Sequence, residues 1–121
     1  MNELEKIKLI IESKYYFEIY NAITSYLRDN PDAFWYDGDY CYLHWYKLGL
    51  CDYKIVELYY VADQGTKIME ILVEASIEAF DMEGIGLMNR SMTEKLRIGA
   101  NIDSEYENFE VVYVGQYMSS F

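Results

Sequence analysis

The amino-acid sequence predicts a single α+β domain in which a small antiparallel sheet of three to four strands packs against two or three helices. Segments with a helical spacing of apolar residues lie beside segments that alternate in polarity or are rich in β-branched and aromatic residues. The predicted strands follow one another through short turns, which is typical of antiparallel pairing with helices on one face. The length of 121 residues fits one domain over residues 1–121.

Residues 3–28 are predicted to be helical, with an interruption. Apolar residues recur at helical spacing in two stripes, which are Leu4, Ile7 and Ile11 and then Tyr15, Ile19, Ala22, Ile23 and Tyr26. At about 100° per residue, the second stripe is rotated by roughly a quarter turn from the first. We therefore expect a bend near Ser13 and Lys14. Asn30-Pro31 predicts the end of the helix, because a residue before proline leaves the helical region.

Residues 33–47 are predicted to form a hairpin around the turn signal Asp37-Gly38. On its second arm, Cys41, Leu43 and Trp45 share one face, which we assign to the core. The other face is an aromatic ladder that a helix covers or a partner contacts, and it consists of Tyr40, Tyr42, His44 and Tyr46.

Residues 53–61 are predicted to form a third strand, although a helix in the same window remains possible. In the strand interpretation, Val56, Leu58 and Tyr60 form one face, and Tyr53, Glu57 and Tyr59 form the more polar one.

Two further helices and a last strand are predicted in the second half of the chain. Residues 66–80 carry apolar side chains at helical spacing, namely Ile68, Ile71, Leu72, Ala75 and Ala79. Ser91 and Glu94 have the spacing of a capping box, which predicts a short helix ending near Gly99. Residues 109–117 are predicted to be a strand, because they contain Val111-Val112-Tyr113-Val114.

The charge of the chain argues against several classes of function. It has 21 Asp and Glu against 10 Lys and Arg, a net charge of −11, and a pI near 4.4. Direct binding to nucleic acid is not expected, because phosphate backbones select basic surfaces. No apolar run is long enough to span a membrane, and the first residues lack the features of a signal peptide, so we expect a cytoplasmic protein with no membrane partner.

The sequence contains no motif that defines a reaction. It lacks a nucleophile elbow, a phosphate-binding loop and a His-Glu-x-x-His pair, so we do not expect an enzyme or a cofactor. Cys41, His44 and Cys51 offer three possible zinc ligands, whereas structural zinc sites use four, so we expect no metal and reduced thiols. Cys41 and His44 lie on opposite faces of the predicted strand, which argues against a catalytic dyad.

Three acidic clusters are the candidate interaction sites. Glu70, Glu74 and Glu78 fall at four-residue spacing on the predicted helix, and Asp81 returns to the same side. The other clusters are Asp103, Glu105, Glu107 and Glu110 with interleaved aromatics, and Asp32, Asp37 and Asp39 beside Trp35, Tyr36 and Tyr40. The alternative for the first cluster is a solvated helix face, and for the other two it is turn acids near ordinary core aromatics. The candidate partner-binding residues are Glu70, Glu74, Glu78, Asp81, Tyr40, Tyr42, Asp37, Asp39, Glu105 and Glu107.

Carboxylates beside aromatic rings suit the capture of an Arg- and Lys-rich protein surface. The leading hypothesis is therefore a non-enzymatic inhibitor that occupies the basic groove of a nucleic-acid enzyme. In size, charge and absence of motifs the chain resembles phage anti-defence proteins, including anti-CRISPR proteins and DNA mimics. The first alternative is an immunity or antitoxin-type protein that neutralises a basic toxin nuclease. The second is a small-ligand-binding domain with a pocket formed by Tyr40, Tyr42 and His44.

Overall fold

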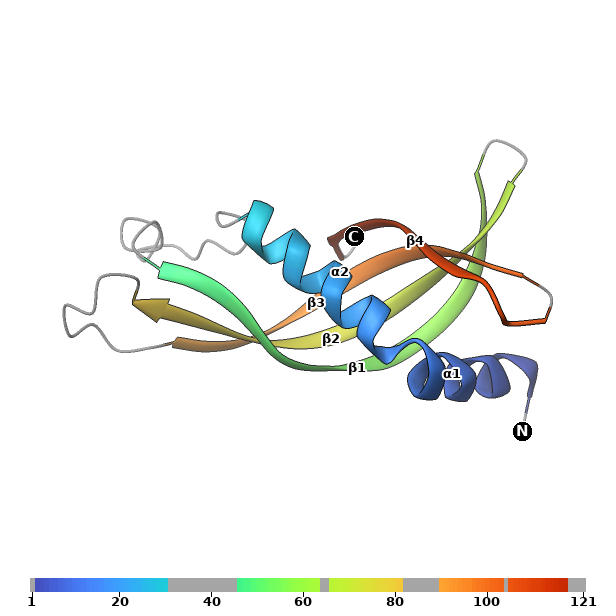
Figure 1. The fold of residues 1–121 in the computed structure, drawn as a ribbon, viewed down its shortest axis with the longest axis horizontal. Helices are drawn as coiled ribbons and strands as arrows, with labels where there is room; N and C mark the ends of the chain where they lie inside the picture. The colour runs from blue at the N-terminus through green and yellow to red at the C-terminus, as the bar shows by residue number, and fades with distance from the viewer. Residues whose placement is uncertain (1, 31–45, 64–65, 82–89, 104, 118–121) are drawn as a thin grey trace, which may run out of the picture.

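Two helices precede a four-stranded antiparallel sheet, which confirms the predicted α+β class (Figure 1). The computed structural model describes residues 2–30, 46–63, 66–81, 90–103 and 105–117. The elements are α1 Glu3–Lys14, α2 Tyr16–Asp29, β1 Tyr46–Asp63, β2 Thr66–Asp81, β3 Arg90–Ile102 and β4 Phe109–Gln116. The strand order β1-β2-β3-β4 means that each strand pairs with its neighbour in the sequence.

The predicted helical region is confirmed, and its interruption lies at Tyr15. Asn2 begins α1, because its side-chain oxygen accepts a hydrogen bond of 2.8 Å from the backbone N–H of Glu5. Tyr15 has φ −121° and ψ 22°, which lies outside the helical region and separates α1 from α2. The end of α2 at Asp29 agrees with the stop predicted from Asn30-Pro31.

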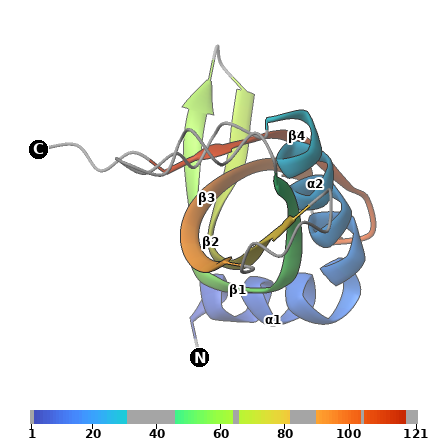
Figure 2. The ribbon, with the colours of Figure 1, turned by 90° about the vertical axis from the view of Figure 1, so that its left-hand side faces the viewer.

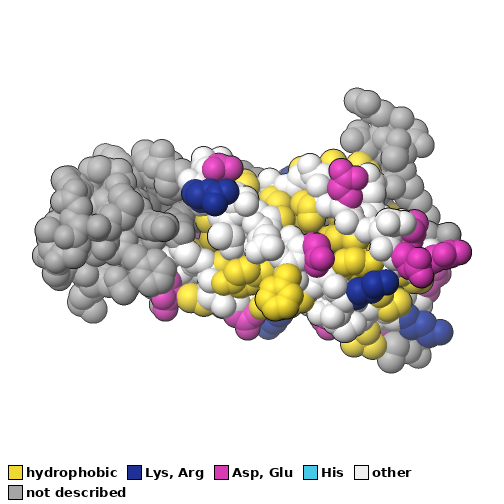
Figure 3. All heavy atoms as spheres, viewed as in Figure 1, with side chains coloured by type: hydrophobic (Ala, Val, Ile, Leu, Met, Phe, Trp, Pro, Cys, Tyr) yellow, Lys and Arg dark blue, Asp and Glu magenta, His cyan; other side chains and the backbone are white. Residues whose placement is uncertain are grey.

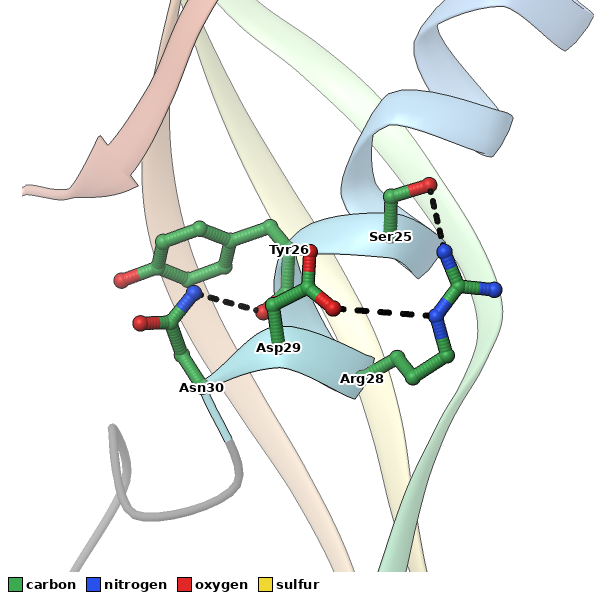
Figure 4. Close-up of polar contacts among 5 residues, drawn as sticks. All are labelled: Ser25, Tyr26, Arg28, Asp29 and Asn30. Carbon is green, nitrogen blue, oxygen red and sulfur yellow. Dashed lines mark hydrogen bonds and ion pairs between the residues drawn. The ribbon is translucent and has the colours of Figure 1, made fainter.

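Side chains close the last turn of α2 (Figure 4). The Asn30 amide donates a hydrogen bond of 2.9 Å to the carbonyl of Tyr26, and Arg28 Nε lies 3.8 Å from Asp29 Oδ1. The Tyr26 side chain lies on the sheet side, where its hydroxyl is hydrogen-bonded to the backbone of Gln116 in β4. The end of α2 is therefore attached to an edge strand of the sheet.

The predicted helix over residues 66–80 is wrong, because this segment is strand β2. The same residues also fit a period of two, with Met69, Ile71, Val73, Ala75 and Ile77 buried on one face of the sheet. Antiparallel partners on both sides satisfy the backbone of β2 along most of its length, which replaces the hydrogen bonds that a helix would form locally.

The predicted short helix over residues 91–99 is also wrong, because it lies in strand β3. Leu96, Ile98 and Ala100 alternate into the core, and the spacing of Ser91 and Glu94 is not used as a capping box. The predicted strands at 53–61 and 109–117 are confirmed as parts of β1 and β4.

Strand β1 shows one further difference, which concerns its faces. Register shifts lie between Leu50 and Asp52 and between Ile55 and Glu57, so the alternation is not continuous along the strand. As a result Tyr53 is buried, whereas Val56 at the second shift is exposed. Of the predicted hairpin over residues 33–47, residues 33–45 lie outside the described part of the chain.

The core lies between the two helices and one face of the sheet. The helices contribute six buried side chains at four-residue spacing, which are Ile7, Ile11, Tyr15, Ile19, Ile23 and Leu27. The sheet contributes its alternating apolar face from β1, β2 and β3, and partly buried side chains of β4 pack against it. The opposite face of the sheet, which we call the open face, carries Lys54, Glu70, Glu74, Lys95 and Arg97.

Tyrosines attach the helices to the β1 side of the sheet and to the β3–β4 turn. The Tyr20 hydroxyl donates to the Leu50 carbonyl at 2.8 Å, and the Tyr53 hydroxyl donates to the Tyr16 carbonyl at 2.9 Å. The rings of Tyr16 and Tyr53 are stacked with centroids 4.8 Å apart. At the other side, the Tyr15 hydroxyl donates to the carbonyl of Tyr106 at 2.6 Å. Because α2 contacts both β1 and β4, the strongly coiled sheet of Figure 2 brings its two edges to the same helix.

Replacing Ile23 with Ala should lower the free energy of unfolding by about 2–5 kcal/mol, because the side chain is fully buried between α2 and the sheet. Phe17→Ala is the matched control on the same helix. Its side chain is 72% exposed, so we expect a change below about 0.5 kcal/mol. Urea denaturation measures both, and similar losses in the two variants would contradict the observed orientation of α2.

Candidate functional site

A polar row crosses all four strands on the open face of the sheet. Tyr59 of β1 pairs with Glu70 of β2, Glu70 pairs with Gly99 of β3, and Gly99 pairs with Tyr113 of β4. Arg97 lies two residues before Gly99 and therefore on the same face. We call Tyr59, Glu70, Arg97 and Tyr113 the four-strand cluster.

Glu70 lies at the centre of this cluster and is only 6% exposed, which makes it the one buried charged residue in the described part of the chain. The Tyr59 hydroxyl donates a hydrogen bond of 3.1 Å to Glu70 Oε1, and the Tyr113 hydroxyl also hydrogen-bonds Glu70. Arg97 Nη1 lies 3.7 Å from the same Oε1. The buried carboxylate is thus compensated by two hydroxyl donors and one guanidinium, as burial of a charge requires.

Gly99 makes room for the ring of Tyr113. A Cβ atom placed on Gly99 would overlap Cε1 and Cζ of this ring, whereas a Cβ on Gly115 of β4 would meet no atom within 4 Å. The absence of a side chain at position 99 therefore allows Tyr113 to lie across β3 and reach Glu70 on the next strand.

The electrostatics of the cluster keep both phenols neutral. Burial, the hydrogen bond to Glu70 and the negative charge of Glu70 raise the pKa of Tyr113 to about 12, while Arg97 acts in the opposite direction. The same causes raise the pKa of Tyr59, and Glu57 adds to them. At neutral pH the two hydroxyls therefore remain hydrogen-bond donors to the carboxylate.

Glu74 of β2 lies on the open face between cations of the two neighbouring strands. Glu74 Oε2 lies 3.1 Å from Lys54 Nζ of β1, and Lys95 of β3 is its register partner on the other side. Glu78 is half-buried and hydrogen-bonded to the exposed Cys51, and partial desolvation and the charge of this carboxylate raise the pKa of the thiol. The predicted helical stripe of Glu70, Glu74, Glu78 and Asp81 is therefore wrong. These residues belong to a strand, Asp81 is its last residue, and neighbouring strands partly neutralise the first two.

The β3–β4 turn presents the second acidic cluster. The Asp103 carboxylate accepts hydrogen bonds from the Glu107 N–H at 2.8 Å and from Asn108 Nδ2 at 2.6 Å, which lowers its pKa. Tyr106 has a φ of 58°, and its carbonyl accepts hydrogen bonds from Tyr15 and from Lys14 Nζ, the latter at 3.0 Å. The turn is thus held by its own side chains and by the helices.

Glu105, Glu107 and Glu110 are exposed around this turn, and none of them forms an ion pair within the described residues. Figure 3 shows acidic side chains gathered at the end of the molecule where the β3–β4 turn lies. We call Glu105, Glu107 and Glu110 the acidic turn.

The remaining predicted site residues lie outside the described part, namely Asp37, Asp39, Tyr40 and Tyr42. On the described surface, the cavities are open depressions. One of about 320 Å³ lies beside Asp52, Lys54 and Glu74, and one of about 470 Å³ lies beside Asn101 and Asn108. Within the same residues no group of three or more His, Cys, Asp or Glu is arranged to hold a metal, and no helix is long and apolar enough to cross a membrane.

Sequence reasoning missed three of the four cluster residues. It selected Glu70 for a helical acidic stripe and did not select Tyr59, Arg97 or Tyr113. A lone glutamate between Met69 and Ile71, in a segment apolar on both sides, was the available signal. No family model, no curated protein and no solved structure matches this chain.

Gly99→Ala should destabilise the protein by about 1–3 kcal/mol, because the new methyl group displaces the Tyr113 ring from Glu70. Gly115→Ala is the matched control on the neighbouring strand and should change the free energy of unfolding by less than about 0.5 kcal/mol. Equal effects in denaturant unfolding would show that Tyr113 does not depend on the space above Gly99.

The cluster should also make stability sensitive to high pH. Folding raises the pKa of Tyr113 from 10.0 to about 12, so its stabilising contribution is complete below pH 10 and is lost as the pH rises from 10 towards 12. Tyr113→Phe cannot ionise at this position and should lose less stability over that interval. Unfolding free energies measured across this range test the difference, and parallel curves for the two proteins would contradict it.

Proposed function

We propose that this protein is a non-enzymatic acidic binding protein that occupies a basic, nucleic-acid-binding surface of a partner protein and inhibits it. The observation that supports this proposal most directly is the acidic turn, where three exposed carboxylates form no ion pair with a cation of the described residues. The net charge of −11 adds a long-range field of the same sign.

The distribution of charge favours the acidic turn over the sheet as the first point of contact. On the open face, Glu70 and Glu74 are paired with Arg97 and Lys54. Around the turn, by contrast, Lys14 donates to a backbone carbonyl rather than to a carboxylate. The carboxylates of the acidic turn are therefore available for cations of another molecule, and they steer its approach.

The order of the turn reduces the cost of binding. Asp103 fixes the backbone through two side-chain hydrogen bonds, and Tyr15 between the two helices fixes it through a third. A partner then has to immobilise only the exposed side chains, which leaves more of the interaction energy for affinity.

A nucleic-acid enzyme is the partner class that fits this surface, because its groove holds Lys and Arg side chains for phosphate groups. By its size and charge the protein would act as phage anti-defence inhibitors do, the anti-CRISPR proteins among them. An immunity protein acting on a basic toxin nuclease uses the same contacts, so the identity of the captured target distinguishes the two roles.

Reversing the charges of the acidic turn should slow association with the partner. We expect Glu105→Lys with Glu107→Lys to lower the association rate constant by about tenfold or more at low salt and to weaken its salt dependence. Stability should change by less than about 0.5 kcal/mol per site, because both side chains are exposed.

The matched control carries the same charge change on α2, as Glu18→Lys with Asp29→Lys. The target is a protein captured from a host lysate at low salt and then purified, and surface plasmon resonance gives the rates. The proposal is wrong if the target has no basic surface, or if both double variants associate at the same rate over a range of ionic strength.

A further inference from the structure

In the four-strand cluster, the cation Arg97 is held less firmly than the carboxylate of Glu70. Arg97 Nη1 lies 3.7 Å from Glu70 Oε1, well beyond the roughly 2.7–2.9 Å of a charge-assisted hydrogen bond. The Arg97 side chain is 44% exposed, whereas that of Glu70 is 8% exposed. The carboxylate is therefore fixed by its tyrosines, and the guanidinium can leave toward solvent without any movement of the sheet.

We propose that the four-strand cluster is a guanidinium-binding site, filled by the chain's own Arg97 in the free protein and by an arginine side chain of the basic partner in the complex. The proposal rests on the proposed function for the origin of that arginine. It adds a specificity site on the open face that is distinct from the acidic turn.

The chemistry of the site fits a guanidinium. Glu70 supplies a buried carboxylate, which attracts a cation more strongly than an exposed one because solvent screens it less. The rings of Tyr59 and Tyr113 come from opposite edges of the sheet and reach the same carboxylate. Arg97 Nη1 lies 3.7 Å from the same Oε1 that accepts the hydrogen bond from Tyr59, so the guanidinium lies beside this phenol. A planar, weakly hydrated guanidinium suits such a site better than a compact ammonium ion.

Exchange of one arginine for another preserves the charge balance. Removing Arg97 alone would leave Glu70 buried without a cation, which is strongly unfavourable. When an incoming guanidinium takes its place, Glu70 remains paired and Arg97 becomes solvated. Because Arg97 is tethered beside the site, a free guanidinium compound competes poorly with it. A partner arginine competes better, since other contacts, including those at the acidic turn, hold it nearby.

The first test uses the isolated protein and methylguanidinium, with methylammonium as the control cation. Amide signals of Gly99 and Tyr113 in nuclear magnetic resonance spectra should shift saturably in Arg97→Ala, with an affinity about tenfold or more above that of the wild type. Arg97→Ala with Glu70→Gln should show no saturable shift. The proposal is overturned if folded Arg97→Ala does not bind methylguanidinium, or if it binds methylammonium equally well.

Two further measurements test the proposal if the Arg97→Ala protein does not fold. Arg97→Gln keeps most of the side-chain stem and should give the same saturable shifts. In the wild type, the Nε signal of Arg97 should move toward that of a free arginine as N-acetylarginine amide is added at high concentration. An unchanged Arg97 signal together with no binding by Arg97→Gln overturns the site.

Partner binding supplies the last readout. Arg97→Gln removes the internal competitor and should tighten the complex, whereas Glu70→Gln should weaken it, so the two changes have opposite signs. A purely structural ion pair would make both variants weaker and would overturn the exchange. The small-cation experiments involve no partner, so their failure leaves the acidic-turn proposal standing. If charge reversal at the acidic turn does not change the association rate, methylguanidinium binding by the four-strand cluster is still expected.

Discussion

The fold depends on one stripe of six buried helical side chains placed every fourth residue, from Ile7 to Leu27. Four residues at about 100° each advance a helix by about 400°, so the stripe drifts by about 40° per step around a straight helix. Over the full stretch an uninterrupted helix would turn the stripe away from its partner surface. The break at Tyr15 interrupts this drift, and the sheet beside the helices is strongly coiled (Figure 2). Tyr15 in the middle of this stripe and Tyr20 beside it then tie the helices to the β3–β4 turn and to β1.

The sequence predicts the helical part and the flanking strands because their signals are local. The stripe, the break and the stop at Asn30-Pro31 can all be read within a few residues, and so can the β-branched run of β4. Strands β2 and β3 were predicted as helices because the decisive contacts are not local. Ile68 and Leu72 are apolar and buried although they lie on the opposite face from Met69 and Ile71, and this produces an accidental helical spacing. Pairing with residues up to 35 positions away makes these segments strands.

The candidate site also shows that local clusters can be predicted from the sequence, whereas contacts between distant residues cannot. Glu105 and Glu107 were predicted from a local cluster, and the structure places them on an exposed turn. The four-strand cluster assembles Tyr59 and Tyr113, which are 54 positions apart in the sequence, and it exists only in one register of four strands. A slip of one residue in any pairing would move Glu70 or its partners to the other face. The same register places Gly99 under the Tyr113 ring, so a residue without a side chain helps to define a side-chain site.

The open face and the acidic turn differ in whether cations lie close enough to compensate their carboxylates. On the open face, Glu70 is buried beside Arg97 and Glu74 is paired with Lys54, because the low-dielectric neighbourhood of a central strand makes an uncompensated charge expensive. At the β3–β4 turn, carboxylates stay in water and remain unpaired with any described cation, where their mutual repulsion is small. Long-range attraction therefore arises at the turn, while short-range selectivity arises on the sheet, where a cation must match a fixed carboxylate and two rings. A basic partner that is attracted to the acidic turn but does not fit the site on the sheet would associate and dissociate quickly. Association and residence time depend on different contacts.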